Sequence, residues 1–284
     1  YEYRISKYEI SEDMINKANN LGALGITHDN RGANKPATSV SWREAARFVN
    51  WLNADTPPYK FDANGDYLLW DPADTGYDPA NPYRNSLAMY FLPSVDEWYK
   101  AAFYDPVSGD YFEFPTGSNV APTPVASGTD PNTAVYGFGT PTGPAYITNA
   151  GGLSPYGTMA QGGNVWEYEE TDFDVDNAPT TTERAFRGGG WSDSFAHIGS
   201  STRVEADSLD LELSATGFRV ASKTLEPSAD YDSSGSVNGY DFLAWQRGGS
   251  PDPLSVEDLS SWEQQDGGTT LSAATAAVAE QTPL

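Results

Sequence analysis

Two long stretches of this chain, residues 54–90 and 105–160, are rich in proline, glycine, aspartate, asparagine and tyrosine. They contain few apolar runs longer than four residues. Folds made of βαβ units need regular apolar strands and long amphipathic helices, which these stretches do not supply. The composition instead predicts long loops threaded with short strands. Loops of this length in a compact domain usually carry function or need ions to hold them.

Local start signals predict two helices in the first half of the chain. The sequence Ser-Trp-Arg-Glu at 41–44 is a capping box, and apolar residues follow it at helical spacing up to position 52. The sequence Ser-Val-Asp-Glu at 94–97 repeats the device directly after a proline. Glu97 is expected to cap this second helix and to pair with a buried arginine. Residues 217–222 are expected to form a closing strand.

The charge balance excludes some classes of function. The chain has 16 Lys and Arg against 40 Asp and Glu, a formal net charge of −24. Such a surface repels phosphate backbones, so no nucleic-acid partner is expected. Eight Trp and 17 Tyr supply a core that disordered acidic chains lack. No run approaches the roughly 18 apolar residues of a membrane helix, so no transmembrane segment is expected.

A loop near the C-terminus has the spacing of a calcium site. Oxygen-bearing side chains stand at loop positions 1, 3, 5, 9 and 12, and a glycine stands at position 6, where such a loop turns sharply. Position 7 would contribute its backbone carbonyl. The expected calcium ligands are Asp230, Asp232, Ser234, Ser236, Asn238 and Asp241. The alternative is a turn of the same composition without a metal.

This loop and the helix expected after it resemble a type I dockerin repeat, over residues 230–266. The helix-forming sequence at 241–245 recurs at 258–262, but the second loop has lost its oxygen ligands, so one calcium is expected in this module. A dockerin implies a cohesin-like or cell-surface partner, and a plain structural appendage remains the alternative. Residues 225–229 are interpreted as a linker and 267–284 as a flexible tail.

Six short motifs follow one another through the first part of the chain. They are Ile-Ser-Lys-Tyr-Glu-Ile at 5–10, Val-Ser-Trp at 40–42, Leu-Pro-Ser-Val-Asp-Glu-Trp at 92–98, Gly-Asn-Val-Trp-Glu-Tyr at 163–168, Arg-Gly-Gly-Gly-Trp at 187–191 and Gly-Phe-Arg at 217–219. In this order they resemble the formylglycine-generating enzyme (sulfatase-modifying factor) family over residues 1–224. The resemblance implies an α+β fold of the C-type-lectin-like kind, with much irregular loop. The helical calcium module would follow it.

The resemblance also implies a second, structural calcium. The backbone carbonyls of Gly163 and Val165 and the carboxylate of Glu167 would hold it. A further ligand of the family, an Asn or Asp, is replaced by Ala160, which removes one oxygen. The alternative is that Glu167 accepts backbone hydrogen bonds at a turn.

The chemistry of the family depends on two cysteines that bind copper(I), and this chain has no cysteine. Counted from the 187–191 motif, the two positions fall on Asp193 and Ile198. Copper(I) prefers soft thiolates, which neither residue provides, so no copper is expected. With only His28 and His197 in the chain, a multi-histidine metal site is excluded as well.

The main hypothesis is therefore a non-catalytic binding or structural protein on this fold, a pseudoenzyme. A chain free of cysteine, strongly acidic and with a calcium motif is typical of an exported bacterial protein, so an extracellular or cell-surface location is expected, with a leader that this chain does not include. The alternatives are an enzyme of copper-independent chemistry in the former active-site groove, and a surface scaffold component.

The loops at 105–160 and the former groove are the expected ligand-binding surface, for a glycan or a peptide. Its candidate residues are Trp191, Asp193, His197 and Arg203. The tryptophans at 98, 166 and 191 are more typical of core positions. The glycines at 188–190 are expected to let the backbone pass close to neighbouring chain.

Overall fold

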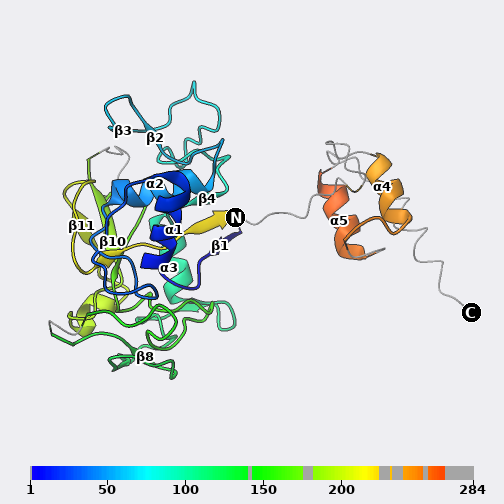
Figure 1. Cartoon of the computed structure of the whole chain (residues 1–284). Coiled ribbons are helices and arrows are strands. Elements are labelled where there is room, and N and C mark those ends of the chain that lie inside the picture. Colours follow the sequence, from blue (N-terminus) through cyan, green and yellow to red (C-terminus); the bar gives the residue numbers. More distant parts are fainter. Residues whose placement is uncertain are drawn as a thin grey trace, which may run out of the picture. The chain divides into compact units, whose positions relative to one another are not determined.

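The computed structural model describes residues 2–139, 143–174, 182–223, 231, 239–251 and 255–265. The chain divides into two compact units, residues 1–223 and 224–284 (Figure 1). Each unit has its own helices and its own apolar core. The two units are therefore described separately.

Three α-helices and one short 3-10 helix lie in the described part of the first unit. They are α1 (Glu12–Gly22), α2 (Trp42–Leu52), α3 (Val95–Phe103) and η1 (Phe195–Ile198). Both predicted capping boxes are confirmed, since the cap serine and the third helical glutamate exchange hydrogen bonds at the start of α2 and of α3. Helix α1 was not predicted. Ser11 caps it, but Met14 stands where a capping box needs Glu or Gln.

The sheets of the first unit are small, and their strands are two to four residues long. One sheet has the order β1-β13-β4 and contains β1 (Tyr3–Ile5), β13 (Ala221–Lys223) and β4 (Tyr90–Phe91). Another has the order β11-β10-β9-β12 and contains β11 (Val204–Ala206), β10 (Arg184–Arg187), β9 (Trp166–Tyr168) and β12 (Thr216–Gly217). Three further pairs join β2 (Lys60–Phe61) to β3 (Tyr67–Leu68), β5 (Tyr104–Asp105) to β6 (Asp110–Tyr111), and β7 (Thr123–Pro124) to β8 (Thr133–Ala134).

The first and last described strands of this unit, β1 and β13, pair antiparallel and close it. The single strand predicted at 217–222 is wrong in its bounds. Residues 216–217 belong to one sheet and 221–223 to another. Between them Phe218 enters the main core and Arg219 forms a buried ion pair, so the chain leaves one sheet before it joins the next.

The main core lies between helices α1 and α2 and the four-stranded sheet. Trp42 is fully buried and packs edge-on against Tyr59 and Tyr67. Glu97 also behaves as predicted, because it caps α3 and forms a buried ion pair with Arg84 at 2.8 Å. The observed class, mixed helices with several small sheets, is the predicted α+β class.

The second unit contains α4 (Gly239–Gln246) and α5 (Val256–Gln265), at the two places where the sequence predicts helices. Trp245, Leu259 and Trp262 form its small core. Of the six expected calcium ligands only Asp241 is among the described residues, and it is buried at the beginning of α4. The other five lie outside the described residues. In the part of the chain that the structure describes, no helix is long and apolar enough to span a membrane.

Candidate functional site

The glycine run after β10 brings the backbone into close contact with its neighbours, as predicted. Gly188 and Gly189 have φ angles of +97° and +72°, which residues with side chains rarely adopt. A Cβ on Gly189 would lie 2.9 Å from Cγ2 of Ile198, and one on Gly190 would lie 3.3 Å from Cβ of Ala215. The run therefore fixes the path of the segment 191–200, which contains most of the predicted site.

Asp193, at the first of the two positions where the family resemblance implies a cysteine, holds a turn. Its Oδ2 accepts hydrogen bonds from Nε1 of Trp166 at 2.7 Å and from the backbone N of Gly190 at 2.8 Å. The Asp193 backbone N donates in turn to the Gly190 carbonyl at 3.1 Å. The Asp193 carboxylate is thus hydrogen-bonded to groups of the protein itself.

Ile198, at the second position, is fully buried. It belongs to a small apolar cluster with Phe114, Ala134 and Tyr136. A side chain in this place supplies packing to the cluster and to Gly189 and has no contact with solvent. Both positions therefore have structural roles in this chain.

Two of the four predicted ligand-binding residues are engaged inside the protein. Trp191 is only 3% exposed, and the Arg31 guanidinium lies 4.9 Å from the centroid of its ring. Arg203 forms a buried ion pair with Glu169 at 2.7 Å and donates to the backbone carbonyls of residues 171–173. A ligand at this surface would meet neither the indole face nor the guanidinium.

The other two, Asp193 and His197, stay partly exposed and meet at the indole of Trp166. The His197 ring packs edge-on against it with 5.8 Å between centroids, and its Nδ1 lies 3.2 Å from Oγ of Ser194. Asp193 and His197 share no hydrogen bond or ion pair with each other within the described part of the chain. Phe195, which the sequence did not single out, is 55% exposed beside them.

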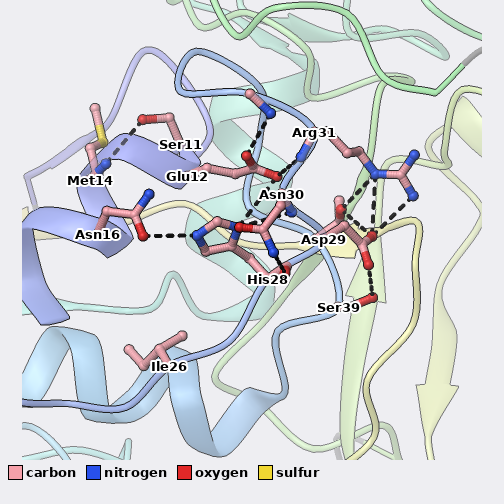
Figure 2. A network of polar contacts seen from close by, with 12 residues as sticks. Ser11, Glu12, Met14, Asn16, Ile26, His28, Asp29, Asn30, Arg31 and Ser39 are labelled. Atoms are coloured by element: carbon pink, nitrogen blue, oxygen red, sulfur yellow. Dashed lines mark hydrogen bonds and ion pairs between the residues drawn. The ribbon is translucent and has the colours of Figure 1, made fainter.

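A polar network holds the loop 27–36 that brings Arg31 over Trp191 (Figure 2). The Glu12 carboxylate, buried at the start of α1, accepts hydrogen bonds from the backbone N atoms of Arg31 at 2.6 Å and Gly32 at 2.7 Å. The ring of His28 lies between Glu12 and Asn16. Its Nδ1 is 3.5 Å from the Glu12 carboxylate, and its Nε2 is 3.1 Å from Oδ1 of Asn16.

Asp29 fixes the other side of this loop (Figure 2). Its carboxylate accepts hydrogen bonds from Thr38, Ser39 and Arg31. Partial burial by itself would raise the pKa of Asp29, but these hydrogen bonds outweigh it and lower the pKa below its ordinary value. The ionised carboxylate and the Glu12 bonds together hold the loop over the indole.

The segment 163–167, where the resemblance implies a second calcium, contains a buried ion pair. Both oxygens of Glu167 accept from Arg219 at 2.5 Å, and Nε1 of Trp98 donates to one of them at 2.6 Å. Calcium bound through Gly163, Val165 and Glu167 would have to share this carboxylate with Arg219. No group of three or more Asp, Glu or His side chains among the described residues could hold a metal. This calcium site stays a prediction.

Glu9 lies beside this ion pair. Its carboxylate is fully buried and accepts from Nδ2 of Asn164 at 2.8 and 3.1 Å. Burial, and then the charge of Glu167, raise the pKa of Glu9 well above its ordinary value. Arg219 thus lies near two buried carboxylates, and of the two it is Glu167 that forms the ion pair with it.

Four tyrosines form a row on the surface, and no local pattern in the sequence predicts it. The ring centroids of Tyr99 and Tyr111 are 5.5 Å apart, those of Tyr111 and Tyr104 are 5.0 Å apart, and those of Tyr104 and Tyr156 are 6.3 Å apart. Tyr111 is 51% exposed and Tyr156 is 44% exposed. We call these four residues the tyrosine row.

Comparison with known proteins agrees with this architecture. The sequence profile of the sulfatase-modifying factor enzyme 1-like domain matches residues 3–224. Two solved structures cover 78% of the chain with TM-scores of 0.55: Treponema denticola variable protein 1, at 20% identity over 84% of its length, and a protein described as CarF, at 22% identity over 87% of its length. No curated protein matches the chain. At these identities the structures establish the fold alone. The chain therefore belongs, through residues 3–224, to the sulfatase-modifying factor enzyme 1-like domain family.

Proposed function

We propose that the first unit is a non-catalytic recognition domain that keeps the fold of its family without the copper chemistry of formylglycine-generating enzymes. One observation carries this proposal. The two positions at which the resemblance places the copper-binding cysteines hold Asp193, which is hydrogen-bonded into a turn, and Ile198, which is buried in an apolar cluster. The chain has no cysteine elsewhere to replace them.

The surface left for recognition differs from the one expected from the sequence. Trp191 and Arg203 are engaged within the fold, whereas Asp193, His197 and Phe195 face solvent at least in part. A ligand at the former groove would therefore contact the latter three. Exposed tyrosines provide further contact area elsewhere in the unit. A glycan or a peptide is the class of ligand that such a surface suits, because it combines aromatic and polar side chains.

A purely structural role is the second candidate, and the loop 27–36 favours it. This loop is held by Glu12 and Asp29, and it places Arg31 over the ring of the buried Trp191, so the protein's own side chain occupies that ring face. An enzyme that used Asp193 and His197 as a catalytic pair would need these two side chains in contact. Both contact Trp166 instead, so no observation favours that alternative.

For the second unit we keep the proposal of one calcium, bound by the loop 230–241. The spacing of the oxygen-bearing side chains along this loop, with a glycine at its sixth position, supports it. A dockerin-like module of this kind would attach the protein to a cohesin-like or cell-surface partner, outside the cell. The strongly acidic composition fits that location.

An array of glycans and peptides, probed with the full chain in the presence of calcium and again with a chelator, tests the recognition function. We expect a restricted set of glycans or peptides to bind. Because we assign this binding to the first unit, the same ligands should bind in the presence of calcium and in the presence of the chelator. Binding to none of the probes, or equal binding to all of them, would contradict a recognition function and leave the structural role.

A further inference from the structure

The tyrosine row is assembled from three separate segments. Tyr99 lies on α3, Tyr104 and Tyr111 are direct partners across the hairpin of β5 and β6, and Tyr156 lies in the turn 154–158. Cross-strand partners of this kind present their side chains on one face of a hairpin. Tyr156 then stacks on Tyr104 with an angle of 27° between the ring planes. The row runs from α3 across the hairpin to the turn.

The turn that carries Tyr156 is anchored on both sides. The backbone N of Gly157 donates to the Ser154 carbonyl at 2.8 Å, and the two hydroxyls of Ser154 and Thr158 lie 2.7 Å apart in the protein interior. Pro155 has the fixed φ angle that such a turn requires at its second position. The ring of Tyr156 is therefore held in place before any ligand arrives, and such preorganisation lowers the entropy cost of binding.

The hydroxyl groups of the row differ from those of the core tyrosines in their bonding. None of the four has a hydrogen-bond partner within the described part of the chain, whereas the hydroxyls of the core tyrosines do: Tyr59 donates to Glu170, Tyr136 to the Pro122 carbonyl and Tyr168 to the Leu211 carbonyl. The row thus offers aromatic rings together with phenol hydroxyls that form no hydrogen bond within the described part of the chain. This combination suits a ligand that has both C–H faces and hydroxyls.

The charges around the row select against ionic ligands. The protein's own cations already approach the rings, with Arg187 5.4 Å from the centroid of Tyr99 and Lys100 5.9 Å from that of Tyr104. A cationic ligand would have to compete with these groups for the same rings. An anionic polymer would meet the field of a chain with a net charge of −24.

We propose that the tyrosine row is a binding site for a neutral oligosaccharide, whose pyranose rings stack on Tyr111, Tyr104 and Tyr156 while their hydroxyl groups bond to the phenol hydroxyls. The proposal rests on the recognition function inferred above and assigns that function to this surface. Tyrosine suits such a role because it supplies a large, rigid contact area and a polar group at low cost in side-chain entropy.

Isothermal titration of the full chain with cellohexaose, xylohexaose, mannohexaose and laminarihexaose tests the proposal. We expect at least one of these neutral probes to bind to the wild type. Tyr111→Ala and Tyr156→Ala should each weaken that binding about tenfold, the equivalent of about 1.4 kcal/mol. Tyr111→Phe keeps the ring and should weaken it less. Tyr146→Ala is the matched control, since Tyr146 is 52% exposed and lies outside the row.

The possible results distinguish an error in the proposed site from an error in the proposed recognition function. If no neutral hexasaccharide binds, or if the two alanine variants bind as well as wild type and as the Tyr146→Ala control, the proposed site is wrong. Tighter binding of tetramethylammonium or of oligogalacturonate than of every neutral probe would overturn it as well. A ligand found on the array whose binding these variants leave unchanged would overturn this site and leave the recognition function standing. Thermal melts of each variant show that the fold is intact.

Discussion

Single residues decide what this domain can do at the two positions where the family resemblance implies copper-binding cysteines. Asp193 and Ile198 are both joined to the fold, one by hydrogen bonds to Trp166 and Gly190 and the other by apolar packing. The sequence was sufficient to exclude thiolate chemistry, because that depends only on residue type. It could not show that the positions have structural roles, because Trp166 and the apolar cluster around Ile198 lie far from them along the chain.

At the same scale, the buried Glu9 gives a prediction about pH. Burial and the charge of Glu167 raise its pKa, so the folded state holds the proton more tightly than the unfolded state does. The stabilisation from this proton is complete at low pH and is lost as the pH rises from the ordinary pKa of a glutamate through the raised pKa. Glu9→Gln removes the titrating group and keeps an oxygen for Asn164.

We expect the stability of Glu9→Gln relative to wild type to be greater at pH 8 than at pH 4, because only wild type loses the contribution of the Glu9 proton as the pH rises. Urea unfolding of both proteins at the two pH values measures this difference. A difference between variant and wild type that stays constant, or that becomes more unfavourable as the pH rises, would contradict the raised pKa of Glu9.

At the scale of elements, helices were predictable where their start signals are complete. Helices α2 and α3 have a full capping box, whereas α1 begins at Ser11 without the glutamate that completes the pattern. The tyrosine row and the position of the loop 27–36 over Trp191 were not predictable in this way. Both depend on contacts between segments far apart in sequence, for which no local pattern exists.

The cap of α3 gives a prediction at this scale. Oγ of Ser94 accepts from the backbone N of Glu97, so Ser94→Ala leaves that donor without its partner. We expect the free energy of unfolding to fall by about 1 kcal/mol, within a range of about 0.5–2 kcal/mol. Ser192→Ala is the control, because it changes an exposed serine that caps no helix. Its free energy of unfolding should stay within about 0.5 kcal/mol of that of wild type. Equal stability of the two variants in urea unfolding would contradict the capping role.

At the scale of the whole molecule, the chain has two units with separate cores, and family membership is established for the first. The α+β class and the helices of the second unit were predicted from the sequence. The position of Arg31 over Trp191 was not predicted, since the two residues lie far apart in the sequence. Sequence motifs therefore identified the scaffold more fully than the surface that it presents.

Calcium should act on one unit only. A ligand that binds the folded state alone stabilises it by about 2.7 kcal/mol at a hundredfold excess over its Kd. In calorimetry of the full chain we expect calcium to raise the transition of the unit 224–284 and to leave that of the unit 1–223 in place. Asp230→Ala should abolish the shift, whereas Asp258→Ala, in the second half of the module, should keep it. A shift of the first unit would indicate a calcium site there, at Gly163, Val165 and Glu167.

The central claim is that this domain keeps the fold of its family without the copper chemistry of formylglycine-generating enzymes. Its most direct test is mass spectrometry of a cysteine-containing peptide incubated with the full chain, copper(I) and oxygen, beside an active formylglycine-generating enzyme as the positive control. We predict that this chain leaves the peptide cysteine unconverted, with or without copper. Copper-dependent appearance of formylglycine in the peptide would contradict the account.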